Sequence, residues 1–338
     1  MKLKRIALAA LSATLVLGLT ACGTSQNTTP SQSGSTSGQK MTLRLADIQP
    51  ADYPTVVGDN EFAKLVKERT NGRITISVYP NAQLGDEKTA IEQLQLGAID
   101  FGRINASPLA SFDKQLNVFN LPYLFSSSDQ MWKVLNGPIG DQMLAGLKDS
   151  KMIGLTYYDS GARNFYNSKK PVVHPQDLAG LKIRVQQSDM FIDLVKTLGG
   201  SPTPMAYGEV YSALQTGVID GAENNWPSYY STNHYKVAKY LTLDEHSRTP
   251  EILLASQSTW NKLSADDQKI VLQAAKDSQA VQRKAWTDLE NKAIQAAKDN
   301  GNVVTKVDIT EWQKAAQPLY DKYGKDYTSI IDQIRATK

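Results

Sequence analysis

One arginine in an apolar stretch is the residue whose surroundings point most directly to binding chemistry. Arg184 lies between Ile183 and Val185, and this run predicts a buried strand. A guanidinium group inside a strand needs a counter-ion, because an unpaired charge is costly to remove from water. Its planar fork matches a carboxylate through two parallel hydrogen bonds. The counter-ion is either an acidic ligand or an Asp or Glu of the same chain, and the residues alone leave both alternatives open.

More polar residues follow this strand and the next one along the chain. Gln186 comes directly after the first strand, and a helical pattern that begins near Tyr207 leads to a second short strand at 218–219. A polar loop is predicted over 220–225. Because ligands of open α/β sheets bind beyond the carboxyl ends of the strands, we expect a site at this edge. The loop supplies three candidate side chains: Glu223, Asn224 and Asn225.

The elements that position such a site are predicted from hydrophobic periodicity. Residues 41–47 and 74–79 alternate as half-buried strands do, with a helical pattern over 57–69 between them. A second helix, 88–96, leads to a short strand at 99–102. This β-α-β-α-β order predicts a mostly parallel sheet with helices on both faces. Three polar residues flank these elements and join the candidate site: Glu87, Arg103 and Asn105.

A long uninterrupted helix is predicted in the last quarter of the chain. Residues 264–267, Ser-Ala-Asp-Asp, resemble a capping box at a helix start. From there to Asp299 the sequence contains no Gly or Pro and keeps helical apolar spacing, and Asn300-Gly301 ends it. A chain of 338 residues is long enough for two domains, each with its own core. The helix is longer than one small domain requires.

The charge distribution gives no support to nucleic-acid binding. The formal net charge is +3, but Lys2, Lys4 and Arg5 lie in an apparent leader, so the rest of the chain has no net formal charge. It also lacks a long block of Lys and Arg. Proteins that bind nucleic acids need concentrated positive charge to neutralise phosphates. We therefore expect no nucleic-acid partner.

The first residues predict export and attachment to a membrane. A basic start precedes an apolar run, 6–21, that is too short to span a bilayer comfortably. The run ends in Leu-Thr-Ala-Cys, which resembles a bacterial lipoprotein box. We expect a signal peptide over 1–21, a lipidated Cys22 and, over 22–40, a flexible tether rich in Ser, Thr, Gly and Gln. The alternative is an ordinary secretory leader with an incidental Cys.

No pattern in the sequence supports catalysis or a metal centre. It contains no Gly-x-Ser-x-Gly, no P-loop, no dinucleotide-type glycine fingerprint and no His-Glu-x-x-His. Its three histidines, His174, His234 and His246, have no metal-ligand spacing, and its one cysteine is Cys22. A hydrolase with a pair of carboxylates has no positive support. We expect a protein that is not an enzyme and that uses no cofactor or metal.

Several segments resemble the solute-binding proteins of tripartite ATP-independent periplasmic (TRAP) transporters, the dicarboxylate-binding-protein-like family. The resemblance extends from Met41 to Tyr320, and its segments occur in the order expected for the family. The segments that carry it are NGRITISVYPNAQLGDEKTAIEQLQLGAIDFG (71–102), FNLPYLF (119–125), GARNFYNSKKPV (161–172), GLKIRV (180–185), SPTPMAYGEVYSALQTGVIDGAENN (201–225) and HYKVAKYLTL (234–243).

The resemblance implies a fold. Members of this family have a two-lobed α/β fold similar to type II periplasmic binding proteins, with mixed sheets, a hinge cleft and one long helix that spans both lobes. For this chain it predicts one lobe made of 41–161 plus 250–289. The second lobe is then made of 162–249 plus 290–338. The ligand is expected in the cleft between them.

The resemblance also implies roles for particular residues. Arg184 matches the arginine that clamps the ligand carboxylate in the family, Arg163 matches a second arginine, and Asn224 matches an asparagine that reaches the ligand. A salt bridge at the hinge is the alternative for Arg163. The complete set of candidate ligand-binding residues is Glu87, Arg103, Asn105, Arg163, Arg184, Gln186, Tyr207, Glu223, Asn224, Asn225 and Trp226.

The make-up of this set favours a sugar acid as the ligand. A C4-dicarboxylate mainly needs a second cation, whereas a sugar acid needs several hydroxyl partners and an aromatic face. The segment AENNWPSYY (222–230) also resembles the branch that binds galacturonate or glucuronate. We therefore expect an extracytoplasmic protein, anchored to a membrane, that captures a hexuronate for a TRAP permease driven by an ion gradient. A C4-dicarboxylate ligand, a sensory role and an acidic-sugar hydrolase or lyase are alternatives.

Overall fold

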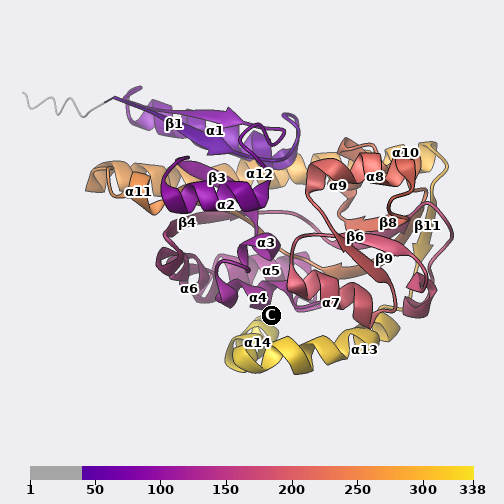
Figure 1. Cartoon of the computed structure of the whole chain (residues 1–338). Coiled ribbons are helices and arrows are strands. Elements are labelled where there is room, and N and C mark those ends of the chain that lie inside the picture. The colour runs from indigo at the N-terminus through magenta and orange to yellow at the C-terminus, as the bar shows by residue number, and fades with distance from the viewer. Residues whose placement is uncertain (1–39) are drawn as a thin grey trace, which may run out of the picture. The chain divides into compact units, whose positions relative to one another are not determined.

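The computed structural model describes residues 40–338, and its strands form two mixed sheets (Figure 1). The first sheet has the strand order β2-β1-β3-β10-β4, in which β1 is parallel to both neighbours and β10 is antiparallel to both of its own. The chain leaves this sheet after β4 and returns to it with β10. Its strands are β1 (Met41–Ala46), β2 (Ile74–Tyr79), β3 (Phe101–Asn105), β4 (Met152–Tyr158) and β10 (Glu251–Ser256).

The second sheet is built from the intervening segment and one later strand. Its order is β11-β9-β5-β8-β6-β7, with β6 parallel to β7 and β8, and β5 antiparallel to β8 and β9. β6 lies between β8 and β7 and carries Arg184, the arginine of the predicted buried strand. Its strands are β5 (Arg163–Asn167), β6 (Lys182–Val185), β7 (Ser201–Pro204), β8 (Gly221–Asn224), β9 (Tyr240–Ser247) and β11 (Val303–Lys306).

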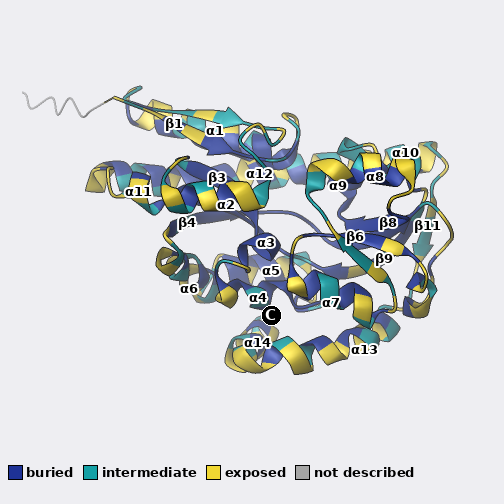
Figure 2. Cartoon of the chain, viewed as in Figure 1, coloured by how far each residue is buried: buried dark blue, intermediate teal, exposed yellow. Residues whose placement is uncertain are grey.

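Helices pack on both sheets through apolar faces, so that many helices in Figure 2 show a buried side and an exposed side. Most strand residues are buried. The helices are α1 (Pro54–Arg69), α2 (Glu87–Leu96), α3 (Ala106–Leu109), α4 (Asn117–Asn120), α5 (Ser128–Leu135), α6 (Pro138–Gly146), α7 (Asp189–Thr197), α8 (Val210–Thr216), α9 (Trp226–Ser231), α10 (His234–Val237), α11 (Gln257–Trp260), α12 (Ala265–Asp299), α13 (Ile309–Leu319) and α14 (Thr328–Ala336).

The long helix predicted from the sequence is confirmed as α12, shown in orange in Figure 1. The side chain of Ser264 caps it by accepting a hydrogen bond from the backbone N–H of Asp267 at 3.1 Å. α12 contacts α1 and β4 on the side of the first sheet, and it contacts α9 on the side of the second sheet. One continuous helix therefore packs against elements that belong to both sheets.

Buried apolar clusters lie against each sheet, and the end of the chain links them. Trp312 of α13 packs with strand residues of the second sheet, whereas Ile331 and Ile334 of α14 pack with those of the first. In Figure 1 these two helices are the yellow segments. We propose that α14 belongs with the first lobe, while the other predicted lobe boundaries stay a prediction.

Some predicted elements differ from the structure. The strand expected at 99–102 is Phe101–Asn105, so Arg103 and Asn105 lie inside it. Residues 218–219 are not in a strand, and the segment expected as a loop after them contains the strand Gly221–Asn224. Its polar side chains are buried because each finds partners there.

Candidate ligand-binding site

Residues from both sheets line one cavity. A second pocket adjoins it and shares Ile48, Glu87, Arg184, Gln186 and Tyr207 with it. β3, β10 and the start of α2 supply one side, while β5, β6, β8 and the start of α9 supply the other. The residues that line the cavity are Ile48, Gln49, Glu87, Arg103, Asn105, Arg163, Arg184, Gln186, Tyr207, Asn224, Asn225, Ser228 and Glu251.

Arg184 is a buried guanidinium with no carboxylate partner among the described residues. It is 4% exposed, and its Nε and Nη2 both donate to the carbonyl oxygen of Met205, at 3.1 and 2.8 Å. Its guanidinium carbon lies 5.8 Å from the ring centre of Tyr207. Burial lowers the pKa of Arg184, because the charged form loses water. The side chain therefore presents an uncompensated positive charge to the cavity.

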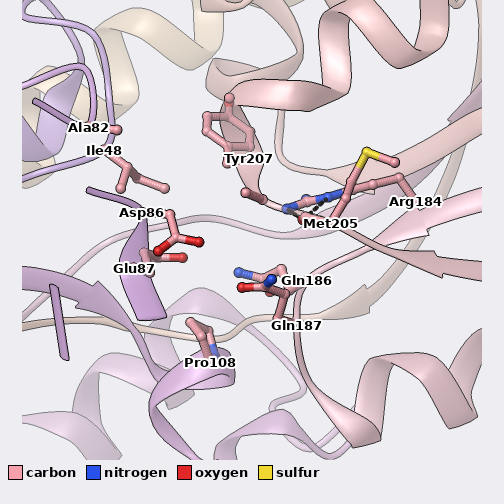
Figure 3. A pocket seen from close by; sticks show the side chains of 12 residues that line it. Ile48, Ala82, Asp86, Glu87, Pro108, Arg184, Gln186, Gln187, Met205 and Tyr207 are labelled. Carbon is pink, nitrogen blue, oxygen red and sulfur yellow. Dashed lines mark hydrogen bonds between the residues drawn. The ribbon is translucent and has the colours of Figure 1, made fainter. Parts of the chain in front are cut away.

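Figure 3 shows how the pocket groups lie around Arg184. Gln186 lies near the middle of the view, Tyr207 above it, and Asp86 and Glu87 on the side opposite Arg184. β6 holds Arg184 in place through its pairing with β7 and β8. The guanidinium that could bind an anion thus belongs to a strand inside the second sheet. A strand fixes the position of this group better than a loop would.

Arg163 contrasts with Arg184, because its guanidinium pairs with a carboxylate of the chain. Its Nη2 donates to Glu223 Oε1 at 2.9 Å and to the Glu223 carbonyl oxygen at 3.0 Å, and its Nε contacts Oε2 of the same residue. His246 lies between Glu223 and Asp244 in the same buried network, with 2.7 Å from its Nδ1 to Asp244. Burial raises the pKa of Asp244, whereas His246 and the backbone N–H of Phe165, which donates to Asp244, oppose the rise. Two acidic and two basic side chains thus meet in one buried network.

Arg103 is also saturated, by carboxylates on three different elements. Its Nε donates to Asp47 Oδ2 at 3.0 Å, and its Nη1 lies 2.6 Å from Glu251 Oε2 and 3.3 Å from Glu87 Oε1. The Arg103 guanidinium is nearly inaccessible. Asn105 extends the network, because its side-chain amide donates to Glu251 Oε1 at 2.8 Å and its backbone N–H donates to Glu87. This side of the cavity therefore carries more carboxylates than cations.

Several cavity residues keep buried polar atoms with no hydrogen-bond partner in residues 40–338. These atoms are Gln49 Oε1, Gln186 Oε1 and the Tyr207 hydroxyl. Burying such an atom without a partner costs free energy, so their presence at one cavity indicates a polar ligand that supplies the missing partners. They suit hydroxyl groups, since amide oxygens accept and a phenol both donates and accepts.

One hydrogen-bond pair joins the two sides of the cavity. The hydroxyl of Tyr53, just before α1, lies 2.8 Å from Ser228 Oγ and donates to Asn225 Oδ1 at 3.3 Å. Asn225 also caps α9 by accepting from the Ser228 backbone N–H. The Tyr53 ring packs edge-on against Trp286 of α12. The cavity wall is therefore tied to the long helix.

The structure brings most of the predicted site residues together around the cavity. Glu223 and Trp226 do not line the cavity: Glu223 lies behind Arg163, and Trp226 packs in an apolar cluster with Tyr229. Cys22 lies outside the described residues. Sequence reasoning missed Ile48, Gln49, Ser228 and Glu251. Gln49 follows a predicted strand end and could have been found there, whereas nothing in the sequence near Glu251 links it to β3.

Comparison with known proteins agrees with this architecture. The family model described as bacterial extracellular solute-binding protein, family 7, matches residues 45–326. The chain belongs to this family. Crystal structures of TRAP periplasmic solute-binding proteins are similar to it: that from Bradyrhizobium sp. btai1 b, in complex with galacturonate, is 45% identical, with a TM-score of 0.86 and coverage of 88% of this chain and 100% of that chain.

Two further crystal structures extend the comparison within the family. The TRAP solute-binding protein from Xanthobacter autotrophicus Py2, with bound β-D-galacturonate, is 44% identical and has a TM-score of 0.86. The one from Chromohalobacter salexigens DSM 3043, with bound D-glucuronate, is 40% identical and has a TM-score of 0.85. Each alignment covers 88% of this chain and 100% of the other. The predicted family and two-sheet fold class are confirmed, and the chain is a TRAP solute-binding protein.

None of the helices in residues 40–338 has both the length and the apolar character needed to cross a membrane. Within the same range, no three His, Cys, Asp or Glu side chains are placed to hold a metal ion.

Proposed function

We propose that this solute-binding protein captures a hexuronate, such as galacturonate or glucuronate, and that Arg184 binds its carboxylate. The observation that carries the proposal is the unpaired, buried guanidinium of Arg184 at the cavity. A carboxylate would supply the counter-ion through two charge-assisted hydrogen bonds. The similar proteins crystallised with galacturonate and glucuronate support the same ligand class.

The rest of the cavity suits the hydroxyl groups of a sugar ring. Gln49, Gln186 and Tyr207 have unpartnered polar atoms, and Asn224 and Asn225 line the same space. In contrast, the arginines that could hold a second ligand carboxylate are already occupied by Glu and Asp side chains. These contacts favour a hexuronate over a C4-dicarboxylate. Arg163 remains a proposed ligand residue, since it lines the cavity while it pairs with Glu223.

We also propose how binding serves transport. The ligand enters between the two sheets, and lobe closure buries it through contacts made only in the closed form, such as those of Tyr53 with Ser228 and Asn225. The closed protein then delivers the ligand to membrane permease subunits, and the uptake is driven by an ion gradient that the permease uses. A lipid on Cys22 and a tether over 22–40 would hold the protein at the outer face of the membrane.

A thermal-shift and calorimetric comparison tests the proposal. At a galacturonate concentration about 100 times Kd, binding should stabilise the wild-type protein by about 2.7 kcal/mol. Arg184→Ala should abolish this shift, and Arg184→Lys should weaken binding at least about tenfold, because an ammonium lacks the planar fork. Arg69→Ala is the control, since it removes a half-exposed arginine that pairs with Asp277 far from the cavity. A full shift in Arg184→Ala would show that the carboxylate binds elsewhere.

Three alternatives are separated by simple observations. We propose that the ligand is bound without being altered, so incubation with uronates should return them unchanged; turnover by the pure protein would instead indicate a hydrolase or lyase. A sensory role would be indicated by a receptor kinase, rather than permease subunits, as the binding partner of the liganded form. A succinate or malate shift as large as that of galacturonate would favour the C4-dicarboxylate alternative.

A further inference from the structure

The cavity carries opposite charge on its two sides. Arg184 lies on one side, and Glu87 lies across the adjoining pocket from it (Figure 3). Glu251 lines the main cavity together with Glu87. The two carboxylate side chains are 13% and 9% exposed, so they are largely removed from water. Electrostatic interactions in such a place are stronger than at a surface.

The position of these two carboxylates is fixed by their partners. Glu87 begins α2 and accepts from the Asn105 N–H at 2.9 Å through Oε1, while Glu251 accepts from Arg103 and from the Asn105 amide through its two oxygens. The structure records no hydrogen bond for Glu87 Oε2 among the described residues, so this oxygen remains able to accept one. Arg103 cannot turn toward a ligand without leaving several buried carboxylates unpaired.

We propose that Glu87 and Glu251 determine the ligand class of the site: they exclude acids that carry a second carboxylate, and they accept hydrogen bonds from ligand hydroxyl groups instead. The inference rests on the proposed function, because it assumes that the first carboxylate lies at Arg184. A diacid held there would direct its other carboxylate toward Glu87 and Glu251. Like charges at short range in a poorly solvated site weaken binding by about ten- to hundredfold.

The preference for acids with a single carboxylate should depend on pH, because the ionisation of Glu87 depends on pH. Burial raises the pKa of Glu87 to about 7, with Glu251 and Asp47 adding to the effect and Arg103 and the Asn105 N–H opposing it. Asp59 of α1 lies behind Asp47, and Asp86 precedes Glu87 on its own helix. The other elements packed on α2, which are α3 and α11, carry no charged residue. Glu87 is therefore ionised at pH 8 and mostly neutral at pH 5.5, where free ligand carboxylates stay ionised.

A matched pair of acids tests the proposal. Galactonate and galactarate are both open-chain and differ only at one end, where galactarate has a carboxylate in place of a hydroxymethyl group. Their dissociation constants are measured by displacement of galacturonate at pH 8 and pH 5.5, for the wild type, Glu87→Gln and Glu92→Gln. Glu92 is the control, because it lies on the exposed side of the same helix. Urea unfolding confirms that each variant is folded.

We expect the wild type at pH 8 to bind galactarate at least about tenfold more weakly than galactonate. In Glu87→Gln the affinity for galactarate should rise about tenfold relative to the affinity for galactonate. Lowering the pH should reduce the difference between the two affinities in the wild type and in Glu92→Gln, but not in Glu87→Gln. A wild type that binds both acids equally, or a Glu87→Gln variant that admits galactarate no better at either pH, would overturn the inference. If the wild type fails to bind galacturonate at all, the proposed function itself falls, and this inference falls with it.

Discussion

At the scale of single residues, the site is defined by which buried charges are already paired. Arg103 and Arg163 are occupied by carboxylates of the chain, and Arg184 is not. The cost of burying an ion differs greatly between these two situations, because a paired ion is compensated and an unpaired one awaits a ligand. The same three side chains therefore have different roles, although each lines the cavity.

The buried histidine next to Arg163 gives a prediction at this scale. Burial lowers the pKa of His246, but the Asp244 and Glu223 carboxylates more than offset this and raise it to about 9. A histidine of the unfolded chain has a pKa near 6.5. The stabilisation from the charged form is therefore complete below about pH 6.5 and is lost as the pH rises through about 9. This stabilisation by the charged form of His246 is about 3 kcal/mol.

We expect His246→Gln to lower the free energy of unfolding at pH 6 and to flatten its decline between pH 7 and 9. Urea unfolding at a series of pH values measures both effects. His174→Gln is the control, because His174 is exposed and its contact with Glu311 is screened by water. Glu87, whose pKa burial raises to about 7, contributes to the decline near pH 7 in the wild type and the variant alike, so the difference between the two proteins isolates His246. An unchanged slope in His246→Gln would show that His246 is neutral in the folded protein.

At the scale of elements, α12 holds the connection between the two sheets. Gln282, which is completely buried, accepts from the backbone N–H of Asp159 at 2.8 Å and donates to its carbonyl oxygen at 2.9 Å. Asp159 is the residue after β4, where the chain passes from the first sheet to the second. Ser278, one turn earlier on α12, contacts the Tyr158 hydroxyl at 2.7 Å. The helix thus replaces the sheet hydrogen bonds that this crossing segment lacks.

Removing the Gln282 side chain should therefore destabilise the protein strongly. Gln282→Ala leaves a buried N–H and C=O of Asp159 without partners and opens a cavity, which together cost about 2–4 kcal/mol. Gln273→Ala changes an exposed glutamine of the same helix, which bonds only Asp277, and should cost under about 0.5 kcal/mol. Urea denaturation compares the two variants. Equal stability of both would mean that the crossing segment is held by other contacts.

At the scale of the whole molecule, we propose that the N-terminal segment anchors the protein and that the described residues bind the ligand. The family match covers 45–326, and the described residues begin at 40, so the predicted lipid site lies in neither. A low-hydrophobicity, Ser- and Gly-rich segment lets a folded body move relative to its anchor. Binding and anchoring should therefore be separable by mutation.

Cys22→Ser should release the exported protein from the membrane fraction while leaving galacturonate affinity unchanged. The substitution removes the thiol to which we expect the lipid to be attached, and the cavity is built entirely from residues of the described part. Fractionation of cells and metabolic labelling with a fatty acid measure the first effect, and calorimetry of the released protein measures the second. A wild-type protein that takes up no label would support the alternative of an ordinary secretory leader.

Several features of this protein follow from local patterns in its sequence. The sequence placed Arg184 in a buried strand, because an arginine between apolar residues of a strand has few other positions. It also predicted the long helix through its cap at Ser264 and its lack of Gly and Pro, since helix formation depends on local geometry. The resemblance of several segments to TRAP solute-binding proteins supplied the family.

The tertiary structure alone decided which charged groups are available to a ligand. Nothing near Arg103 in the sequence shows that Glu251, far along the chain on an antiparallel strand, holds it, or that Glu223 holds Arg163. The polar segment after Ile219 became a strand because β5 and β6 provide its backbone partners. Whether a charge is paired depends on where its partner lies in space. Spacing along the chain predicts only contacts between residues that are close in sequence.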